Sequence, residues 1–384
     1  MTTTNHSNAS AYDEIHQAFE AVKQKHRNDL GDKDVNYIKG IRRYSRMFEF
    51  IGRALIWILP GPSALTGVPF LFLHRNLESI EIGHNVLHGQ YDSFDSIPQF
   101  HSRKFRWKAP IDEAAWRQEH NGVHHVHTNV LEKDPDLNHG FLRTNSQTPH
   151  NTWHYFQLPI YLFVVYPGML YNFDAQNFGA NDKFRETRFP LGNTGYATFK
   201  NPDNLTNKEI KKHHNRAVWR VWAKEYGLFP LLALLTGSGF IKVFLCNLLT
   251  DIINNYWIAL TIQATHLTEP LQPESALKNK GKWYVSQLDS SVNFKGSRKQ
   301  SILWGHLNYQ VEHHLYPDIP AYRYPDISLE VIEICKKYNL PYKSNANWWQ
   351  AISNYMGVLW CYSFKNQSAI ENTAFLERAT QHAK

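Results

Sequence analysis

The sequence predicts an all-α integral membrane protein with about four transmembrane helices in two hairpins, capped by a cytosolic helical domain. Three observations lead to this fold class. Two apolar regions are each interrupted by a turn, at residues 60–62 and 236–239. Basic residues precede both regions. Histidines stand where the apolar stretches end, at His84 with His88 and at His266.

The composition supports a few membrane spans beneath a large water-facing part. Of the 384 residues, 42% are hydrophobic and 14% are aromatic, which suits a protein at a membrane interface. The mean hydropathy of −0.49 is too polar for a chain that lies mostly in lipid. The net charge of +7 suits an anionic membrane surface or a phosphate-bearing substrate. We expect no nucleic-acid partner, because no zinc finger, basic zipper or RNA-binding signature occurs.

We expect a single domain over residues 1–384, beginning with a cytosolic helical segment over 1–46. Its apolar residues Ile15, Phe19 and Val22 recur at helical spacing between charges. They predict an amphipathic helix, either packed on the body or lying on a membrane surface. The cluster that follows marks the cytoplasmic side of a span and comprises Lys39, Arg42, Arg43 and Arg46.

The first hairpin is expected over residues 47–83. Each of its apolar runs, 47–59 and 64–73, is shorter than the roughly 20 residues that a full span needs. The turn at 60–62 between them favours a segment that enters the membrane and returns, with a soluble core hairpin as the alternative. The returning arm delivers His84 and His88 to the side on which the chain entered.

Residues 84–225 are expected to be cytosolic, with an interfacial or re-entrant aromatic segment at 153–171. Ten Lys or Arg lie between Lys183 and Lys224, which keeps this region on the cytoplasmic side. The second hairpin follows at 226–266, and its long apolar arm ends at His266. Residues 267–384 have no spanning run and form a C-terminal cytosolic part.

Polar residues inside the second hairpin need an explanation, because burying them in lipid is costly. They are Asp251, Asn254 and Asn255. We expect them to bridge helices or to line the far end of a substrate cavity.

Three histidine clusters and one single histidine predict a metal centre. His84 and His88 are four residues apart, as are His120 and His124, and on a helix His125 lies next to the face of the second pair. The third cluster is preceded by Gln310 on the same helical face. The candidate metal ligands are His84, His88, His120, His124, His125, His266, His313 and His314.

Eight imidazoles are too many for one tetrahedral zinc ion and suit two octahedral ions. Nitrogen-rich sites with open positions point to iron and oxygen chemistry. The bland alternative is a chance grouping in a chain with 21 histidines. Three clusters and His266, all assignable to one membrane face, favour a shared site.

The sequence resembles the membrane fatty acid desaturases, a branch of the membrane-bound di-iron oxidases and hydroxylases. The motifs are G-H-N-V-L-H-G-Q-Y-D at 83–92, H-N-G-V-H-H-V-H-T-N at 120–129 and L-N-Y-Q-V-E-H-H-L-Y-P at 307–317. The third has the Q-x-x-H-H form of front-end, linoleoyl-type and bacterial acyl desaturases. The resemblance runs from about Tyr44 to Pro325 and implies that the eight histidines ligate two iron ions.

The resemblance also implies an activity, which is the insertion of a cis double bond into an acyl chain with O2 and two electrons. No H-P-G-G haem motif occurs, so the expected donor is a separate protein, either ferredoxin with a reductase or cytochrome b5. The acyl chain is carried on coenzyme A, a carrier protein or a phospholipid. We expect an integral protein of the bacterial inner membrane with the active site facing the cytoplasm.

Further residues are candidates for ligation or for positioning the ligands. Gln310 stands where relatives have a histidine, and Gln263 lies one residue after the position at which stearoyl-CoA desaturases have an asparagine. His306 and His127 lie next to the clusters, and His127 is expected to leave the ligand face. Carboxylates that could accept a hydrogen bond from a ligand histidine are Glu81, Asp92, Glu119, Asp134, Asp136 and Glu312.

Two other functions remain open on the sequence alone. The first is a di-iron hydroxylase of alkanes or lipids on the same scaffold, although such enzymes have H-E-L-x-H where this chain has H-N-V-L-H. The second is a non-catalytic, histidine-rich metal-binding membrane protein. That function calls for ligands along several spans, whereas here they stand at the ends of spans.

Overall fold

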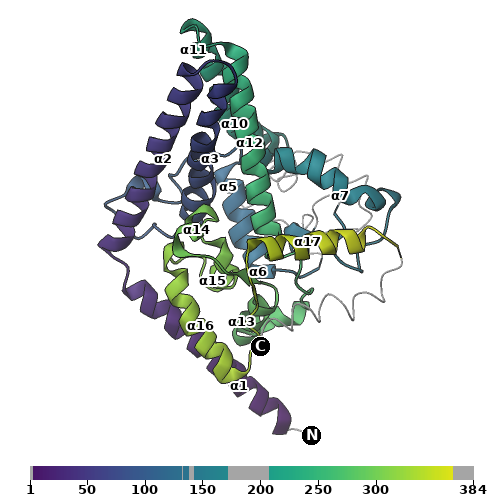
Figure 1. The fold of residues 1–384 in the computed structure, drawn as a ribbon. Coiled ribbons are helices and arrows are strands. Elements are labelled where there is room, and N and C mark those ends of the chain that lie inside the picture. Colours follow the sequence, from purple (N-terminus) through teal and green to yellow (C-terminus); the bar gives the residue numbers. More distant parts are fainter. Residues whose placement is uncertain (1–2, 132, 138–141, 172–206, 366–384) are drawn as a thin grey trace.

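The computed structural model describes residues 3–131, 133–137, 142–171 and 207–365. Its regular structure is almost entirely helical, and β1 (Asn293–Phe294) pairs with β2 (Ser344–Asn345) in a short parallel ladder. The prediction of an all-α fold class is therefore confirmed for the secondary structure. A narrow helical bundle forms one end of the molecule, and a broader helical body forms the other (Figure 1).

The N-terminal helix α1 (Thr3–Asn28) packs along the body. Ile15 and Phe19 on its apolar face are buried in one core cluster with α13 (Lys280–Asp289) and α16 (Tyr324–Tyr338). Of the two sequence-based expectations for this helix, packing on the body is therefore the one observed.

The first hairpin consists of α2 (Asp32–Ile58) and α3 (Val68–Asn76), joined by the 3-10 turn η1 (Gly61–Gly67). The helices approach closely because glycine stands at their contact. A Cβ atom on Gly52 would lie 2.7 Å from a backbone nitrogen of α3. Since α2 begins at residue 32, the boundary expected at 46/47 falls inside this helix.

The second hairpin has a first arm of α10 (Asn207–Trp222), η10 (Ala223–Leu228) and α11 (Phe229–Leu235), and its second arm is α12 (Phe240–Gln263). Contacts of α12 with both α11 and α3 join the two hairpins into one bundle. Asp251 of α12 pairs with Arg75 of α3, so one of the polar residues expected to bridge helices does so.

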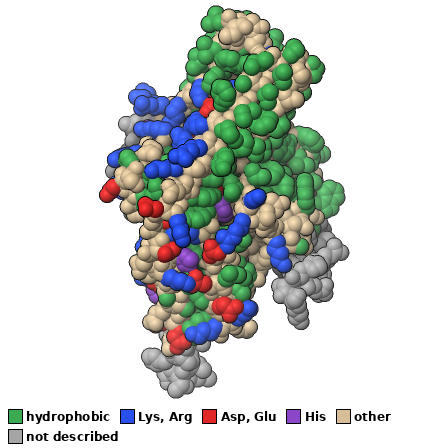
Figure 2. All heavy atoms as spheres, turned by 60° about the vertical axis from the view of Figure 1, so that its left-hand side comes forward, with side chains coloured by type: hydrophobic (Ala, Val, Ile, Leu, Met, Phe, Trp, Pro, Cys, Tyr) green, Lys and Arg blue, Asp and Glu red, His purple; other side chains and the backbone are tan. Residues whose placement is uncertain are grey.

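The face of the bundle seen in Figure 2 carries many hydrophobic side chains. The exposed hydrophobic residues of the bundle include Phe50, Ile58, Leu231, Leu234, Leu235, Ile241 and Leu245. Among the described helices, α12 is the one that is long and apolar enough to cross a membrane by itself.

The aromatic segment expected at 153–171 runs at an angle to α12 and extends away from it to one side (Figure 1), with η8 (Tyr166–Gly168) as the part that contacts α12. It is one continuous helical stretch made of η6 (Thr152–Phe156), α7 (Gln157–Ile160), the π-helical η7 (Tyr161–Val165) and η8. Helix α17 (Trp348–Tyr362) packs against α7. The two segments leave several large apolar side chains exposed, namely Phe156, Phe163, Val164, Trp349 and Trp360.

The remaining elements build the body around the histidines. They are η2 (Leu77–His84), α4 (Asn85–Leu87), η3 (Pro98–Phe100), α5 (Glu113–Trp116), η4 (Arg117–His124), α6 (His125–His127), η5 (Pro135–Leu137), η11 (Glu274–Lys278), α14 (Arg298–Leu303), η12 (Leu307–Tyr309), α15 (Gln310–Leu315) and η13 (Ala321–Arg323). Part of the basic stretch expected on the cytoplasmic side, residues 172–206, lies outside the described residues.

Candidate metal centre

Two of the three histidine clusters lie at the ends of π-helical turns. Helix α3 passes directly into η2, and α5 passes directly into η4. A π-helix pairs residue i with residue i+5, one residue further along than an α-helix does. His125 therefore faces His120, with their Nε2 atoms 3.2 Å apart. His120 and His124 still stack, with ring centroids 5.1 Å apart, so this pair lies together as expected, and the π-helical turn adds His125 opposite His120.

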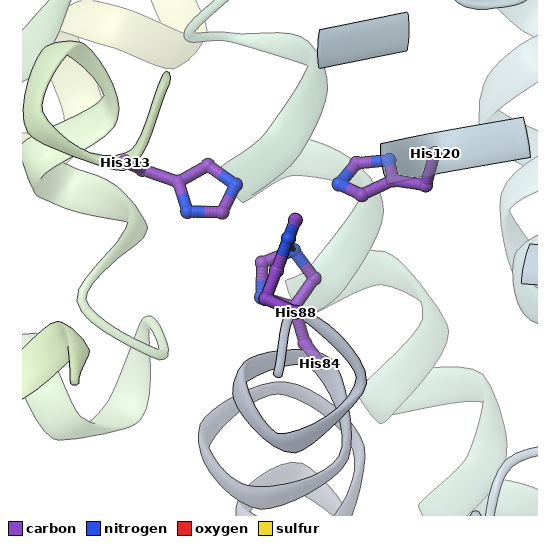
Figure 3. Close-up of side chains that lie close together, drawn as sticks. All are labelled: His84, His88, His120 and His313. Carbon is purple, nitrogen blue, oxygen red and sulfur yellow. Dashed lines mark hydrogen bonds between the residues drawn. The ribbon is translucent and has the colours of Figure 1, made fainter. Parts of the chain in front are cut away.

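Four histidines from three parts of the chain form a first group (Figure 3). His84 and His88 lie at the end of η2 and just after α4, His120 lies in η4, and His313 lies in α15. One ring nitrogen from each lies within 4.8 Å of the others, and all four residues are buried. The Nε2 atoms of His84 and His88 are 3.3 Å apart.

A second group consists of His124, His266 and His314, again with ligand atoms within 4.8 Å of one another. His266 lies just beyond the end of α12, which carries it from the bundle into the body. Its Nε2 is 3.0 Å from the Nε2 of His314. His125 joins the two groups, because it also forms a close set with His313 and His314. The eight histidines singled out in the sequence thus form one continuous buried cluster.

Burial keeps most of these imidazoles uncharged. It lowers the pKa of His84 to about 4. Burial, with a further contribution from neighbouring imidazoles, lowers the pKa well below its ordinary value in His88, His120, His125, His313 and His314. A metal ligand must be a neutral imidazole with a free lone pair, and these rings meet that condition at neutral pH.

His124 differs from the other rings in its electrostatic surroundings. Burial alone would lower its pKa, but Asp134 and Asp136 outweigh burial and raise the pKa to about 10. The Nδ1 of His124 lies 2.9 Å from Oδ1 of Asp134, whereas Nε2 is buried without a hydrogen-bond partner in the described part of the chain. At a pKa of about 10 the ring by itself carries a proton on both nitrogens, so a metal ion would have to displace the Nε2 proton while Asp134 keeps the proton on Nδ1.

In other rings too, one nitrogen lies beside a protein acceptor and the other faces the histidine groups. The Nδ1 of His314 lies 3.0 Å from Oε1 of Gln287, and its Nε2 faces His266. The Nδ1 of His84 lies 3.2 Å from Oδ1 of Asn85. Acceptors beside Nδ1 hold the proton there, so that the Nε2 lone pairs converge.

Several buried nitrogens of the cluster have no hydrogen-bond partner among the described residues. They are both ring nitrogens of His313, the Nδ1 of His120 and His125, and the Nε2 of His124. Unpaired buried polar atoms are costly, and a bound metal ion would satisfy the inward-facing ones. The donor set of neutral imidazoles therefore fits metal binding.

The model of the fatty acid desaturase family matches residues 55–346, which is most of the chain. This protein belongs to the fatty acid desaturase family. Its sequence is 29% identical over 336 residues to an NADPH-dependent stearoyl-CoA 9-desaturase of Mycobacterium tuberculosis, covering 85% of this chain and 74% of the relative. It is 23% identical over 356 residues to an sn-1 linoleoyl-lipid 6-desaturase of Synechocystis, covering 89% and 92%. An acyl-lipid (8-3)-desaturase of Mortierella alpina is 28% identical over 254 residues, covering 63% and 52%.

Fatty acid desaturases are oxidoreductases, and this family member is therefore one. The two candidate glutamines, Gln310 and Gln263, lie in different surroundings. The Nε2 of Gln310 lies 2.6 Å from the Nε2 of His266, and its Oε1 is buried without a partner among the described residues. Gln310 thus lies at the second histidine group. The Oε1 of Gln263 instead accepts hydrogen bonds from Tyr166 and Tyr355, each at 2.7 Å.

The two histidines next to the clusters, His306 and His127, make contacts outside both groups. The Nδ1 of His306 lies 3.0 Å from Oε2 of Glu81. The half-buried His127 places its Nδ1 2.9 Å from the backbone oxygen of Val123. Neither takes part in a set of converging ligand atoms within the described chain.

Two candidate carboxylates, Glu312 and Asp92, contact residues other than the histidines of the three clusters. Glu312 is fully buried and accepts hydrogen bonds from Asn293 and Tyr342 at 2.9 and 2.8 Å. Burial raises its pKa to about 7. Asp92 accepts two hydrogen bonds from the backbone and side chain of Ser102, each at 2.6 Å, and so closes a loop.

The sequence predicted only some of the residues that form hydrogen bonds with the Nδ1 atoms of the clustered histidines. Asp134 and Asp136 were two of six nearby acids, and both lie beside the Nδ1 of His124, at 2.9 and 3.4 Å. No sequence signal pointed to Gln287, because α13 reaches His314 through tertiary packing alone.

A tryptophan that sequence reasoning missed covers the first group. The ring of Trp116 stacks on His120 with centroids 4.4 Å apart. It also contacts His84 and His88 at 5.4 and 5.2 Å. Its position four residues before His120 was an available signal, since residues at this spacing share a helical face.

Proposed function

We propose that this protein is a membrane-bound di-iron acyl desaturase, which introduces a cis double bond with O2 and two electrons from a separate donor. The observation that carries the proposal is the meeting of eight buried imidazoles in overlapping groups whose nitrogens lie within 4.8 Å of one another. Relatives named for acyl-CoA and for acyl-lipid substrates support an acyl chain as the substrate. Its carrier is coenzyme A, a carrier protein or a phospholipid.

The two irons divide between the histidine groups. The first is held by His84, His88, His120 and His313, and the second by His124, His266 and His314. His125 lies between the groups and completes one of the two sites. Gln310 stands beside His266 and supplies a carboxamide to the second site.

Bound iron supplies the oxygen activation that an unactivated methylene group requires. Burial keeps the imidazoles other than His124 neutral, and outward contacts such as that of Asp134 with His124 fix the orientation of the rings. Trp116 covers the first group on one side. The buried setting excludes bulk water from the reacting atoms, which suppresses side reactions.

The two hairpins cross the membrane four times, and the active site and both termini face the cytoplasm. The apolar surface of the bundle and the length of α12 support insertion. The basic cluster at 39–46 supports the orientation. Segment 153–171 lies in the interface, and the exposed Trp349 and Trp360 of α17 extend this interfacial surface. In a bacterial cell this membrane is the inner membrane.

The electron donor docks on the water-facing part of the chain. Ferredoxin with a reductase and cytochrome b5 are the two candidates, and the net charge of +7 supports docking of an acidic protein.

Fatty acid analysis of a bacterial host that expresses the full chain tests the proposal. The wild-type chain should produce a new cis-unsaturated fatty acid, and His124→Ala should abolish it at a matched protein level. His127→Ala is the matched control, because this ring lies off the ligand groups. Hydroxylated products in place of unsaturated ones would instead establish the hydroxylase alternative.

A further inference from the structure

One helix supplies hydrogen-bond acceptors to two of the three rings in the second histidine group. Gln287, in the last turn of α13, places its Oε1 3.0 Å from the Nδ1 of His314. Ser290, which ends α13, places its backbone oxygen 3.4 Å from the Nδ1 of His266. Amide oxygens only accept hydrogen bonds, so both rings carry their proton on Nδ1. Their Nε2 lone pairs are thereby turned toward each other, at 3.0 Å.

A threonine joins the same glutamine to the remaining ring of the group. The Oγ1 of Thr128 lies 3.0 Å from Oε1 of Gln287 and 3.1 Å from the Nδ1 of His314. It also lies 2.9 Å from the backbone oxygen of His124. Gln287 is buried, and its Nε2 has no hydrogen-bond partner among the described residues. The oxygen of this side chain is therefore the atom that acts on the group.

The first histidine group is held differently. The Nδ1 of His84 lies 3.2 Å from Oδ1 of Asn85, its neighbour in the chain. The Nδ1 atoms of His120 and His313 have no hydrogen-bond partner among the described residues. Within this part of the chain, no hydrogen bond joins α13 to the first group. A displacement of α13 should therefore loosen the second group and leave the first in place.

The N-terminal helix α1 packs directly on α13. Gly281 marks their close approach, because a Cβ atom at this position would overlap the backbone oxygen of Tyr12. The ring of Phe19 stacks on that of Tyr284, with centroids 4.9 Å apart. The Tyr284 hydroxyl donates to Glu20 at 3.3 Å. These contacts fix the position of α13 from the N-terminal side.

The same part of α1 supports the helix that carries His314. The backbone oxygen of Phe19 accepts a hydrogen bond at 3.0 Å from Tyr316, which directly follows α15. Phe19 also shares one buried apolar cluster with Leu288 and Leu315. In Figure 1, α1 lies at the end of the body opposite the bundle, beside α13 and α16. It thus backs both the acceptor helix and the ligand helix of the second group.

We propose that Gln287 is a positioning residue for the second histidine group, and that α1, by holding α13 in place, sets how tightly this group alone retains its metal ion. The inference rests on the proposed function, because it concerns the iron held by His124, His266 and His314. It adds that one iron depends on the N-terminal helix and the other does not.

Iron release from the purified, iron-loaded full-length protein to an excess of chelator tests the proposal. Gln287→Leu removes the acceptor at similar size, whereas Gln287→Glu keeps an accepting oxygen. Gly281→Ala forces α1 away from α13. The matched controls are Gln157→Leu, a buried glutamine of α7 that bonds to backbone groups, and Gly52→Ala, at the contact of α2 with α3.

Gln287→Leu and Gly281→Ala should each release one iron per chain about 10–100-fold faster than the wild type, the effect of losing a residue that orients a ligand. The other iron should leave at the wild-type rate. Gln287→Glu should release both irons as slowly as the wild type. Both controls should leave iron release unchanged, and melting temperatures measured on the same samples report any loss of folding stability.

Double variants identify which iron is affected. Because His266→Ala already weakens the second site, adding Gln287→Leu should leave the release of its more firmly held iron unchanged. Added to His88→Ala, which weakens the first site, Gln287→Leu should speed the release of the more firmly held iron.

Faster release of both irons in the single variants, unchanged release in Gln287→Leu or in Gly281→Ala, or failure of Gln287→Glu to keep release slow would overturn the proposal. A wild-type chain that holds two ions of another metal would overturn the proposed function instead. The same release experiment on that metal would still test the dependence of the second group on Gln287 and α1.

Discussion

His266 is the least obvious of the proposed iron ligands, because it belongs to none of the three histidine clusters. His266→Ala should abolish desaturation as completely as His124→Ala does. The ring supplies one of three converging nitrogens in the second group, and its Nε2 is 3.0 Å from that of His314. Without it, the second iron is left with His124, His314 and the intermediate His125.

The size of the effect follows from the role of the ring. Losing a residue that only orients a ligand lowers metal affinity about 10–100-fold, which is roughly 1.4–2.7 kcal/mol. Removing a ligand lowers it by at least this amount. Truncating a buried side chain also leaves a cavity that lowers folding stability. The melting temperature of the iron-free protein measures this packing effect separately.

The assay is product formation in membranes, with the amount of each variant matched by immunoblot. His127→Ala should retain measurable activity, because its Nδ1 bonds to the backbone away from the ligand groups. Near wild-type unsaturation in His266→Ala, together with an inactive His124→Ala, would refute ligation by His266. The second site would then have to recruit Gln310, which lies 2.6 Å from the same ring.

Two further predictions follow from single contacts, and a third follows from the proposed membrane orientation. Asp134→Asn should lower iron retention against a chelator about 10–100-fold through loss of an orienting carboxylate, with unchanged retention counting against that role. Gly83→Ala should lower the melting temperature, because a Cβ would lie 1.9 Å from Nε1 of Trp107 and overpacking costs about 1–3 kcal/mol; a stable variant would exclude this packing. In intact cells, a membrane-impermeant thiol reagent should label Thr236→Cys at the bundle tip and spare Lys208→Cys, whereas the reverse pattern would contradict the proposed orientation.

The convergence of the clustered histidines could be predicted because a metal site imposes a local sequence pattern. His84 and His88 are four residues apart, a spacing that brings two imidazoles together on a helix. The adjacent His313 and His314 instead reach different histidine groups. His266 was identified because it ends a long, mostly apolar stretch of the sequence. These features depend on residues near one another in the chain.

The contacts that support the ligands depend on tertiary structure and were less accessible. The π-helical turn that brings His125 opposite His120 has no sequence signature that distinguishes it from an α-helical turn. Gln287 reaches His314 only because α13 packs beneath α15. Asp134 could be named as one of several acids, but the sequence alone did not select it.

In the fold as well, features set by local sequence were predictable and features set by tertiary packing were not. The hairpin turn at 60–62 and the long apolar helix were predictable from breakers and hydropathy. The packing of α1 on the body was left open, because an amphipathic face suits protein and membrane equally. The apolar exposure of α17 was missed, since this helix is too short to register as a span.

The metal content of the purified full-length protein tests the central claim most directly. Elemental analysis of protein produced with ample iron should find about two irons per chain, as expected for nitrogen ligands divided between two sites. Stoichiometric zinc, with no desaturation regained after reconstitution with iron, would contradict the di-iron account.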